Sequence, residues 1–270
     1  MMRNSAIPAA FLLIFLAFSC APNPYRATNK VYKKQAKDYA RAIGQFPVKN
    51  PALHALQFVG TTNMSMRRPQ LVILHHTAQN SCDQTLRTFT IPRTQVSSHY
   101  VVCREGLVYQ MLHDQFRGHH AGVSWWGGQS DINSNSIGIE IDNNGSEIFP
   151  DVQIDSLMSV LHYLKTSYRL PAKAFIGHAD IAPGRKVDPS RYFPWKKLAD
   201  AGYGIWFDTT AVQVPENFDP MLALRVIGYN TAKPENAILS YKIKFLPSDT
   251  TRFLNESDHK ILYSLMLQSL

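Results

Sequence analysis

The sequence contains little cysteine, and none of it has a metal-binding spacing. Three cysteines occur among 270 residues, at positions 20, 82 and 103. No Cys-x-x-Cys pair is present, which excludes a cysteine knuckle of the usual kind. The His-Glu-x-x-His and His-x-x-Glu-His signatures of common zinc peptidases are missing as well. Metal chemistry in this chain would therefore have to use histidines and carboxylates from separate segments.

Long apolar runs and long basic runs are also scarce. The apolar stretch over residues 7–18 is interrupted by Pro8 and is shorter than the roughly 20 residues of a membrane-spanning helix. The net charge of +8 comes from cations spread along the chain, not from a basic run interleaved with aromatic residues. Nucleic acid is therefore not an expected partner, whereas an anionic envelope polymer or membrane surface suits the charge. The apolar share of 45% and the charged share of 18% indicate a folded chain.

The first 20 residues predict export. Arg3, the apolar stretch and the small residues after it are typical of a secretory signal peptide over residues 1–19. Cys20 follows a small serine and resembles the lipobox cysteine of bacterial lipoproteins, which carries acyl chains after cleavage. The usual leucine three positions earlier is Ala17, so an ordinary signal peptide or an uncleaved anchor is the alternative. Ala21 in place of aspartate predicts an outer-membrane lipoprotein that faces the periplasm.

The pairing of the other two cysteines is open. An exported chain meets an oxidising compartment, where a disulfide between Cys82 and Cys103 can form. Two buried free thiols fit the sequence equally well, because the spacing does not fix the distance between them.

Apolar patterning predicts four segments after the signal peptide. Residues 20–64 form a tether and an N-terminal segment with a helix over 29–43. Residues 65–202 form the main domain and 203–220 a linker. Three short helical patterns over 221–270 make a small module, too short to hold a catalytic cleft.

Strand and helix patterns alternate within the main domain. Short apolar runs over 70–75, 136–142 and 174–177 have the length and branched residues of buried strands. An amphipathic helix is expected over 151–168, and a hairpin around the Gly106 turn. This alternation predicts a mixed α/β fold, with a central mixed sheet flanked by helices.

Three potential metal ligands lie at the ends of these strands or just beyond them. His75 ends the first strand, His178 follows the third, and Asp188 lies on the next loop. Sites in open α/β sheets form at the carboxyl ends of the strands. Two histidines and a carboxylate with an open fourth position are typical of catalytic zinc. The sequence therefore predicts one zinc ion, bound by His75, His178 and Asp188.

Two charged side chains are expected beside that ion. Lys186 lies two residues before Asp188, so both can face one site and the cation can stabilise negative charge on an oxygen. Glu140 lies in mid-strand, on the face opposite three isoleucines, and therefore faces something other than the apolar core. A carboxylate in that place can take a proton from water and return it to a leaving amine.

Taken together, these motifs resemble a known family. They are His75-His76-Thr77-Ala78, Ser98-His99-Tyr100, His120-Ala121-Gly122, Ile137-Gly138-Ile139-Glu140, and Gly177-His178 followed after nine residues by Asp188-Pro189. Their order and strand context resemble the type 2 N-acetylmuramoyl-L-alanine amidases, whose zinc amidase fold is shared with peptidoglycan recognition proteins. The resemblance covers roughly residues 65 to 202. With the expected lipid anchor and C-terminal module, the chain is close to the AmiD-type lipoprotein amidases of the outer membrane.

The resemblance implies a reaction and assigns roles to the residues already noted. Zinc would be held by His75, His178 and Asp188, with Glu140 as the general base and Lys186 as the oxyanion cation. The bond cut would be the amide between N-acetylmuramic acid and L-alanine of the stem peptide. The substrate would be peptidoglycan or a muropeptide.

The resemblance also suggests further contacts. It implies that His99 and His120 line the substrate groove, where they contact the substrate or support the residues that do. His76 and His119 are expected to be packing or loop residues, and His119 stands where the family often has tryptophan. The segment 221–270 resembles a peptidoglycan-binding helical domain, with a generic helical cap as the alternative. The chain is expected to act as a monomer.

Two other functions compete with amidase activity. A non-catalytic peptidoglycan-recognition lipoprotein would keep the groove but would lack a ligand or the base, and none is missing here. A zinc endopeptidase acting within the stem peptide is disfavoured because the usual helical zinc signatures are absent.

Overall fold

The computed structural model describes residues 23–45, 59 and 61–270. The expected signal peptide, Cys20 and Ala21 lie outside these residues. Within them, no helix combines the length and the apolar character needed to cross a bilayer. The chain divides into two compact units, with the boundary between Asn63 and Met64.

The first unit contains one helix among its described residues, α1 (Arg26–Ile43). It begins three residues before the helix expected over 29–43 and ends, as expected, before Gly44. None of its side chains is buried.

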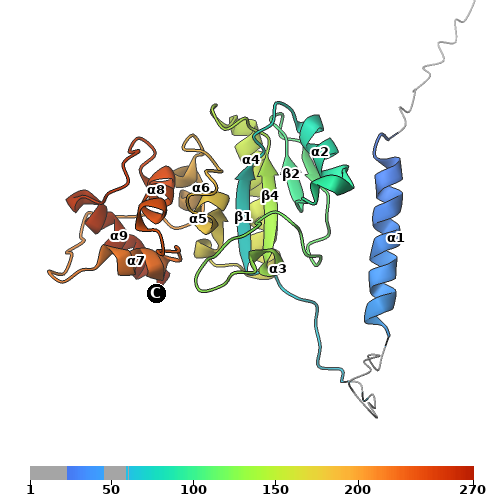
Figure 1. Ribbon diagram of the computed structural model, residues 1–270, viewed down its shortest axis with the longest axis horizontal. Helices are drawn as coiled ribbons and strands as arrows, with labels where there is room; N and C mark the ends of the chain where they lie inside the picture. The colour runs from blue at the N-terminus through green and yellow to red at the C-terminus, as the bar shows by residue number, and fades with distance from the viewer. Residues whose placement is uncertain (1–22, 46–58, 60) are drawn as a thin grey trace, which may run out of the picture. The chain divides into compact units, whose positions relative to one another are not determined.

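Strands and helices alternate in the first part of the second unit, and helices alone follow towards the C-terminus, as Figure 1 shows. The strands are β1 (Leu71–His76), β2 (Tyr100–Val102), β3 (Val108–Gln110), β4 (Ser136–Ile141) and β5 (Phe175–Gly177). The helices are α2 (Cys82–Thr90), α3 (Ile132–Asn135), α4 (Asp151–Tyr168), α5 (His178–Ile181), α6 (Trp195–Asp200), α7 (Pro220–Ile227), α8 (Pro234–Phe245) and α9 (Glu256–Ser269), with 3₁₀ turns at Pro92–Thr94 and Ala172–Ala174.

The five strands form one mixed sheet in the order β3-β2-β4-β1-β5. The pairs β2–β4, β4–β1 and β1–β5 are parallel, and β3 joins the edge as the antiparallel arm of the expected hairpin. Because β1 lies between β4 and β5, its carboxyl end is next to the ends of both neighbours. This confirms the predicted mixed α/β fold with a central sheet.

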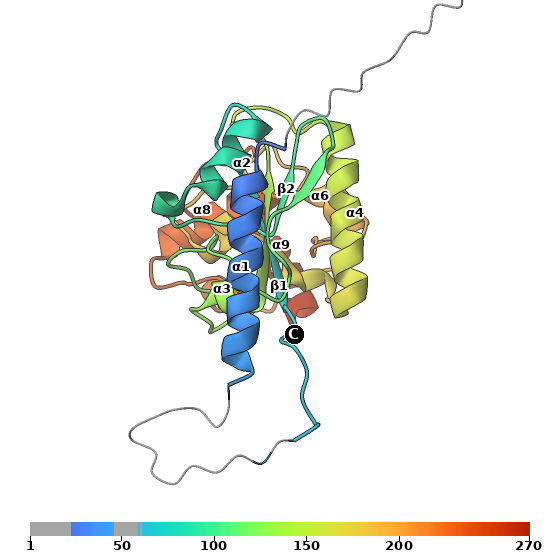
Figure 2. The same ribbon diagram turned by 90° about the vertical axis from the view of Figure 1, so that its right-hand side faces the viewer.

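The two faces of the sheet differ in chemistry, as the period-2 alternation predicts. Val72 and Leu74 of β1 point to the same apolar cluster as the isoleucines of β4, where α4 covers the sheet. Ile73 points to the opposite face and packs near Ala121 and Ile181. Figure 2 shows α4 on one side of the sheet and α2 and α3 on the other. The face away from α4 carries His75, and therefore the predicted site.

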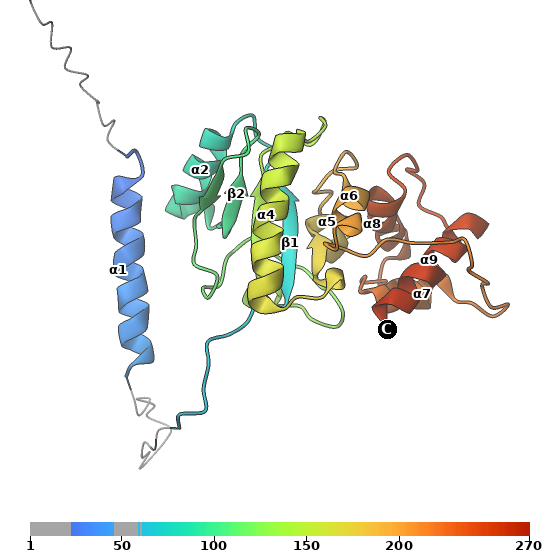
Figure 3. The ribbon, with the colours of Figure 1, turned by 180° about the vertical axis from the view of Figure 1, so that it is seen from behind.

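Helices α7, α8 and α9 enclose an apolar cluster of their own, built around Leu224, Tyr241 and Leu262. They nevertheless belong to the same compact unit as the sheet. Figure 3 shows them beyond α5 and α6, past the β5 edge. The expected separate domain and its affinity for peptidoglycan remain predictions.

The two cysteines left open by the sequence are paired. Cys82, the first residue of α2, is bonded to Cys103, which follows β2, across a Cα–Cα distance of 5.3 Å. The bond ties α2 to the sheet. An oxidising compartment, as expected for an exported chain, is where such a bond persists.

Candidate metal centre

The three predicted ligands are brought together from three segments. His75 is the fifth residue of β1 and is almost fully buried. His178 follows β5 directly and starts the short helix α5. Asp188 lies ten residues further on, in the loop that returns to the sheet. Since β1 and β5 are parallel neighbours, both histidines leave the same edge of the sheet.

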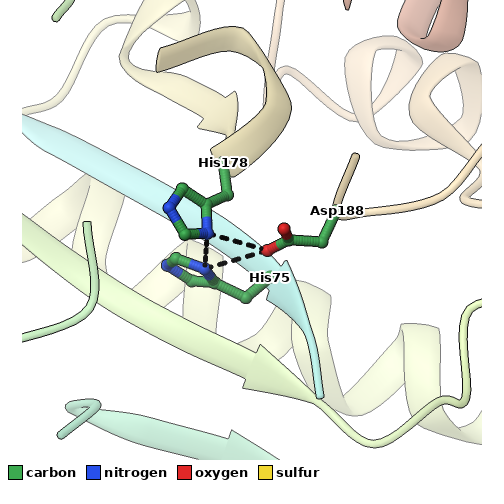
Figure 4. A group of neighbouring side chains, drawn as sticks. All are labelled: His75, His178 and Asp188. Atoms are coloured by element: carbon green, nitrogen blue, oxygen red, sulfur yellow. Dashed lines mark hydrogen bonds and ion pairs between the residues drawn. The ribbon is translucent and has the colours of Figure 1, made fainter. Parts of the chain in front are cut away.

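One ligand atom of each residue faces the same point, as Figure 4 shows. His75 Nδ1 lies 2.9 Å from His178 Nδ1, and Asp188 Oδ2 lies 3.1 Å and 3.0 Å from these two nitrogens. Zinc bonds to nitrogen and oxygen measure about 2.0–2.2 Å, so one ion can reach all three atoms. Within the described residues, this is the set of histidines and carboxylates that converges in this way.

The outer hydrogen bond of His178 determines which of its ring nitrogens is protonated. Nε2 lies 3.1 Å from the carbonyl oxygen of Ala121. A carbonyl oxygen can only accept, so Nε2 carries the proton and the neutral ring presents a lone pair at Nδ1. His178 therefore offers an acceptor, not a donor, to the centre of the site.

A longer chain of hydrogen bonds determines the protonation of His75. Ser136 donates its hydroxyl to the carbonyl of Ile132 at 2.6 Å, so it must accept from His120 Nε2 at 3.3 Å. His120 Nδ1 is then unprotonated and accepts from His75 Nε2 at 3.2 Å. His75 consequently also presents a lone pair at Nδ1.

Three acceptor atoms thus face each other without a proton between them. Such a cluster is electrostatically unfavourable unless a cation occupies its centre. Burial lowers the pKa of His75 to about 4, and this keeps its ring neutral and able to ligate. The residues present therefore fit a divalent metal ion.

Glu140 lies next to the ligands on the neighbouring strand. It is the register partner of His75 in the β1–β4 pair, and its side chain shares the face of His75. Every other residue of β4 is buried, whereas Glu140 is partly exposed. Protein atoms packed around its carboxyl group keep that group from water and, helped by the nearby charge of Asp188, raise the pKa of Glu140 well above its usual range, whereas Lys186 opposes that shift.

Lys186 acts electrostatically on the whole site. Its charge lowers the pKa of Glu140, and it also contributes to the lowering that burial causes at His75 and His76. The cation therefore lies near both the ligands and the predicted base.

His99 is placed beneath the site, not at its surface. It is fully buried, and its Nδ1 accepts a hydrogen bond from the backbone of Gly138 at 3.1 Å. Its Nε2 must then donate to the carbonyl of Phe116, 3.0 Å away. Of the two roles expected for His99, substrate contact or support, its burial favours support.

His120 supports a ligand directly, through the bond to His75. Its ring lies against Gly138, where an added Cβ would overlap the imidazole, so this strand position requires glycine. Asn133 of α3 fixes the adjoining backbone, accepting from the amides of His120 and Ala121 at 3.1 and 2.9 Å. The His-Ala-Gly motif is thus held from both sides.

Sequence reasoning missed Arg185. Its guanidinium donates to the carbonyl oxygens of Ala121 at 2.7 Å and Val123 at 3.0 Å, and lies 3.3 Å from His178 Nε2. It therefore fixes the carbonyl that orients His178. The only available signal was its place beside Lys186, where a solvated basic face was the simpler interpretation.

Sequence reasoning also missed Asp180, which joins the ligand-bearing helix to the C-terminal helices. Its carboxylate accepts from the backbone of Gly177 at 2.8 Å, from Tyr229 at 2.6 Å and from Lys244 at 2.9 Å. The side chains of Asp180, Tyr229 and Lys244 are all buried. The turn that carries His178 is therefore anchored to α8.

Comparison with known proteins finds similarity to amidases of one kind. A family model described as N-acetylmuramoyl-L-alanine amidase matches residues 65–191. The chain is 35% identical over 161 residues to N-acetylmuramoyl-L-alanine amidase AmiD of Escherichia coli (strain K12), covering 54% of this chain and 57% of that protein. It is 35% identical over 108 residues to 1,6-anhydro-N-acetylmuramyl-L-alanine amidase AmpD of Haemophilus influenzae, covering 40% and 59%. The matches thus span less than two thirds of these curated relatives.

Two solved structures share the fold. One is the complex of AmiD from E. coli with the substrate anhydro-N-acetylmuramic acid-L-Ala-D-gamma-Glu-L-Lys, with a TM-score of 0.67 and 26% identity, covering 77% of this chain and 93% of that one. The other is AmpDh3 from Pseudomonas aeruginosa, with a TM-score of 0.68 and 26% identity, covering 80% and 98%.

Proposed function

We propose that the chain is a type 2 N-acetylmuramoyl-L-alanine amidase that depends on zinc and acts on the bacterial cell wall. The match of residues 65–191 to that family and the likeness to AmiD support the proposal. The bond cut is the amide between N-acetylmuramic acid and L-alanine, in peptidoglycan or in muropeptides. The observation that carries the proposal is the convergence of three acceptor atoms from His75, His178 and Asp188. Cell-wall turnover or remodelling is the corresponding role.

The three ligands would hold zinc, which supplies Lewis acidity that polarises the amide carbonyl and makes water a nucleophile near neutral pH. His120, Ala121 and Arg185 keep the two imidazoles oriented, through hydrogen bonds that lead away from the centre. The substrate carbonyl is then attacked in a fixed geometry.

The charged neighbours complete the reaction. Glu140 takes the proton of the attacking water and transfers it to the departing nitrogen, so one water is consumed and a carboxylate and an amine are released. Its raised pKa suits a group that must both accept and donate a proton. Lys186 stabilises the negative charge that develops on the carbonyl oxygen.

Digestion of purified peptidoglycan by the zinc-loaded protein, with mass analysis of the fragments, tests this function. Free stem peptides that begin at L-alanine are expected. Glu140→Gln should reduce turnover roughly 10²- to 10⁴-fold without loss of bound zinc. Glu105→Gln, in the exposed β2–β3 turn, is the matched control. Shortened stem peptides still attached to glycan would indicate an endopeptidase, and undigested material a recognition protein.

The location is proposed from the sequence alone. Cys20 would carry the lipid anchor and place the enzyme at the outer membrane, facing the periplasm. The apolar stretch before Cys20 and Ala21 after it support this. The mass of the N-terminal peptide from membranes tests it, since Cys20→Ser should abolish acylation.

A further inference from the structure

Helix α1 has a charge distribution that the amidase reaction does not use. It contains six cations and one carboxylate in 18 residues, a surplus of five positive charges, against eight for the whole chain. The cations are Arg26, Lys30, Lys33, Lys34, Lys37 and Arg41. More than half of the excess charge of the protein therefore lies on one helix outside the amidase domain.

These six cations lie on one side of the helix, which we call the basic stripe. Successive cations are separated mostly by three or four residues, and at about 100° per residue all six fall within roughly 100° of arc. Asp38 lies at the border of the stripe and pairs with Lys34 at 2.7 Å and with Arg41 at 3.3 Å. All three side chains remain well exposed, so these pairs leave most of the positive charge facing solvent.

The opposite side of α1 is largely apolar. Thr28, Tyr32, Ala36, Tyr39 and Ile43 recur at spacings of three or four residues, in the half of the circumference away from the basic stripe. Ile43 is 76% exposed, and Val31 at the edge of this side is 56% exposed. Helices that have one strongly basic side, one apolar side and a low average hydrophobicity bind to lipid interfaces.

From this arrangement we propose that α1 lies on a lipid bilayer that carries anionic headgroups. The apolar side enters the boundary between headgroups and acyl chains, and the basic stripe pairs with lipid phosphates. A purely polar anionic polymer would satisfy the basic stripe but would leave the apolar side in water, which favours the bilayer. The interaction needs no acyl chain at Cys20.

Vesicle sedimentation tests the proposal on residues 21–270, which lack the apolar leader and Cys20. The protein should bind vesicles of phosphatidylcholine with 30% phosphatidylglycerol far better than vesicles of phosphatidylcholine alone. Lys30, Lys33 and Lys37→Gln together should lower the partition coefficient on the order of 100-fold. Raising the salt to 0.5 M should have a similar effect, because screening weakens exposed charges.

The matched control removes three positive charges elsewhere. Lys196, Lys197 and Lys260 are exposed on the second unit, and their joint change to Gln gives the same net charge. It should leave vesicle binding within about twofold. Equal losses in the two triple variants, or equal binding to both kinds of vesicle, would overturn the proposal. So would binding to isolated sacculi that depends on the basic stripe without any binding to vesicles.

A second measurement asks what covers the apolar side. With Cys82 and Cys103 paired, Ile43→Cys gives a single thiol for an environment-sensitive fluorophore. Its emission should shift to the blue when anionic vesicles are added. Emission that is already blue in buffer and does not respond to vesicles would mean that the chain itself or a second copy covers this side, which contradicts the proposal. Hydrolysis of a soluble muropeptide should be the same in all these variants, so failure here is separable from failure of the amidase function.

Discussion

Two buried clusters of ionisable residues in this protein are built on opposite principles. Near the C-terminus, Lys242 is fully buried, and its ammonium donates to Asp249 at 2.6 Å, to Thr251 at 2.7 Å and to the carbonyl of Phe253 at 2.7 Å. Asp258 lies 3.5 Å away. Every donor there meets an acceptor, and the cluster is complete as it stands.

In the candidate metal centre, acceptors meet acceptors instead. The Nδ1 atoms of His75 and His178 and the Oδ2 atom of Asp188 turn toward one point, while the protons of both rings are used on the outer side. A matched cluster stabilises the fold by itself, whereas a cluster of converging lone pairs requires a cation. This difference is the reason we propose the metal chemistry for the histidine cluster and not for the lysine cluster.

Removing a ligand should have the largest effect on activity. His178→Ala takes away one of the three proposed zinc ligands, so we expect amide hydrolysis to fall on the order of 10³-fold or more. Zinc content by atomic emission should fall with it, and circular dichroism should still show a folded chain. If the variant keeps both zinc and activity, the metal centre has been assigned to the wrong residues.

Removing the buried cation Lys242 should lower the stability of the fold and leave zinc binding unchanged. Lys242→Ala leaves Asp258 buried without its neighbouring charge, which should cost about 3–5 kcal/mol of the free energy of unfolding. Zinc affinity should not change. Urea unfolding and zinc titration of the same sample measure both, and a large loss of zinc affinity would show that the clusters are not independent.

In the zinc-free protein, the two clusters should also affect the free energy of unfolding over different ranges of pH. Burial lowers the pKa of His75 and of His99 to about 4 in the folded chain, from an ordinary value of 6.5. The unfolded chain therefore binds protons first as the pH falls, and stability is lost between about pH 6.5 and 4, by roughly 1.4 kcal/mol per pH unit for each group. Stability from these groups is complete above pH 7.

The Lys242 cluster should respond only at lower pH. The hydrogen bond from Lys242 holds the pKa of Asp249 at about 2, below the ordinary 3.8, so its contribution persists until the pH falls below about 4. Urea unfolding at pH 7.5, 5.5 and 4.5 follows the histidine window, and a further measurement at about pH 2.5 follows that of Asp249. Identical stability at pH 7.5 and 5.5 would contradict the neutral buried histidines.

A smaller effect is expected from the support beneath the ligands. His120→Ala removes the acceptor of the His75 Nε2 proton, and zinc affinity should fall about 10- to 100-fold. His119→Ala, the exposed neighbour, is the control and should bind zinc as the unaltered chain does. Equal affinities for the two variants would mean that the hydrogen bond does not orient His75.

Much of the fold could be predicted from local patterns in the sequence. The alternation of Ile137, Ile139 and Ile141 with Gly138 and Glu140 indicated which face of β4 is apolar, and the structure agrees. The apolar periodicity of residues 151–168 gave α4 with its bounds unchanged. These patterns depend only on neighbours along the chain, which is why sequence reasoning captures them.

The hydrogen-bond partners of the site residues were harder to predict from the sequence. Arg185 meets a carbonyl 64 residues away, and Asp180 meets Tyr229 and Lys244, 49 and 64 residues away. A single sequence carries no periodic signal for such contacts. The burial of His99 was hidden for the same reason, because it depends on the packing of β2, β4 and the loop that holds Phe116.

By itself the sequence determined the residue types and the faces on which they lie. It placed His75 at the carboxyl end of a buried strand, because hydrophobic periodicity is a local property of the chain. The tertiary structure alone decided that His75 Nδ1 and Asp188 Oδ2, which belong to residues 113 positions apart, lie 3.1 Å from each other and that both imidazoles turn a lone pair inward. Protonation of a ring follows from the atom opposite it, and that atom is known only once the strands are packed.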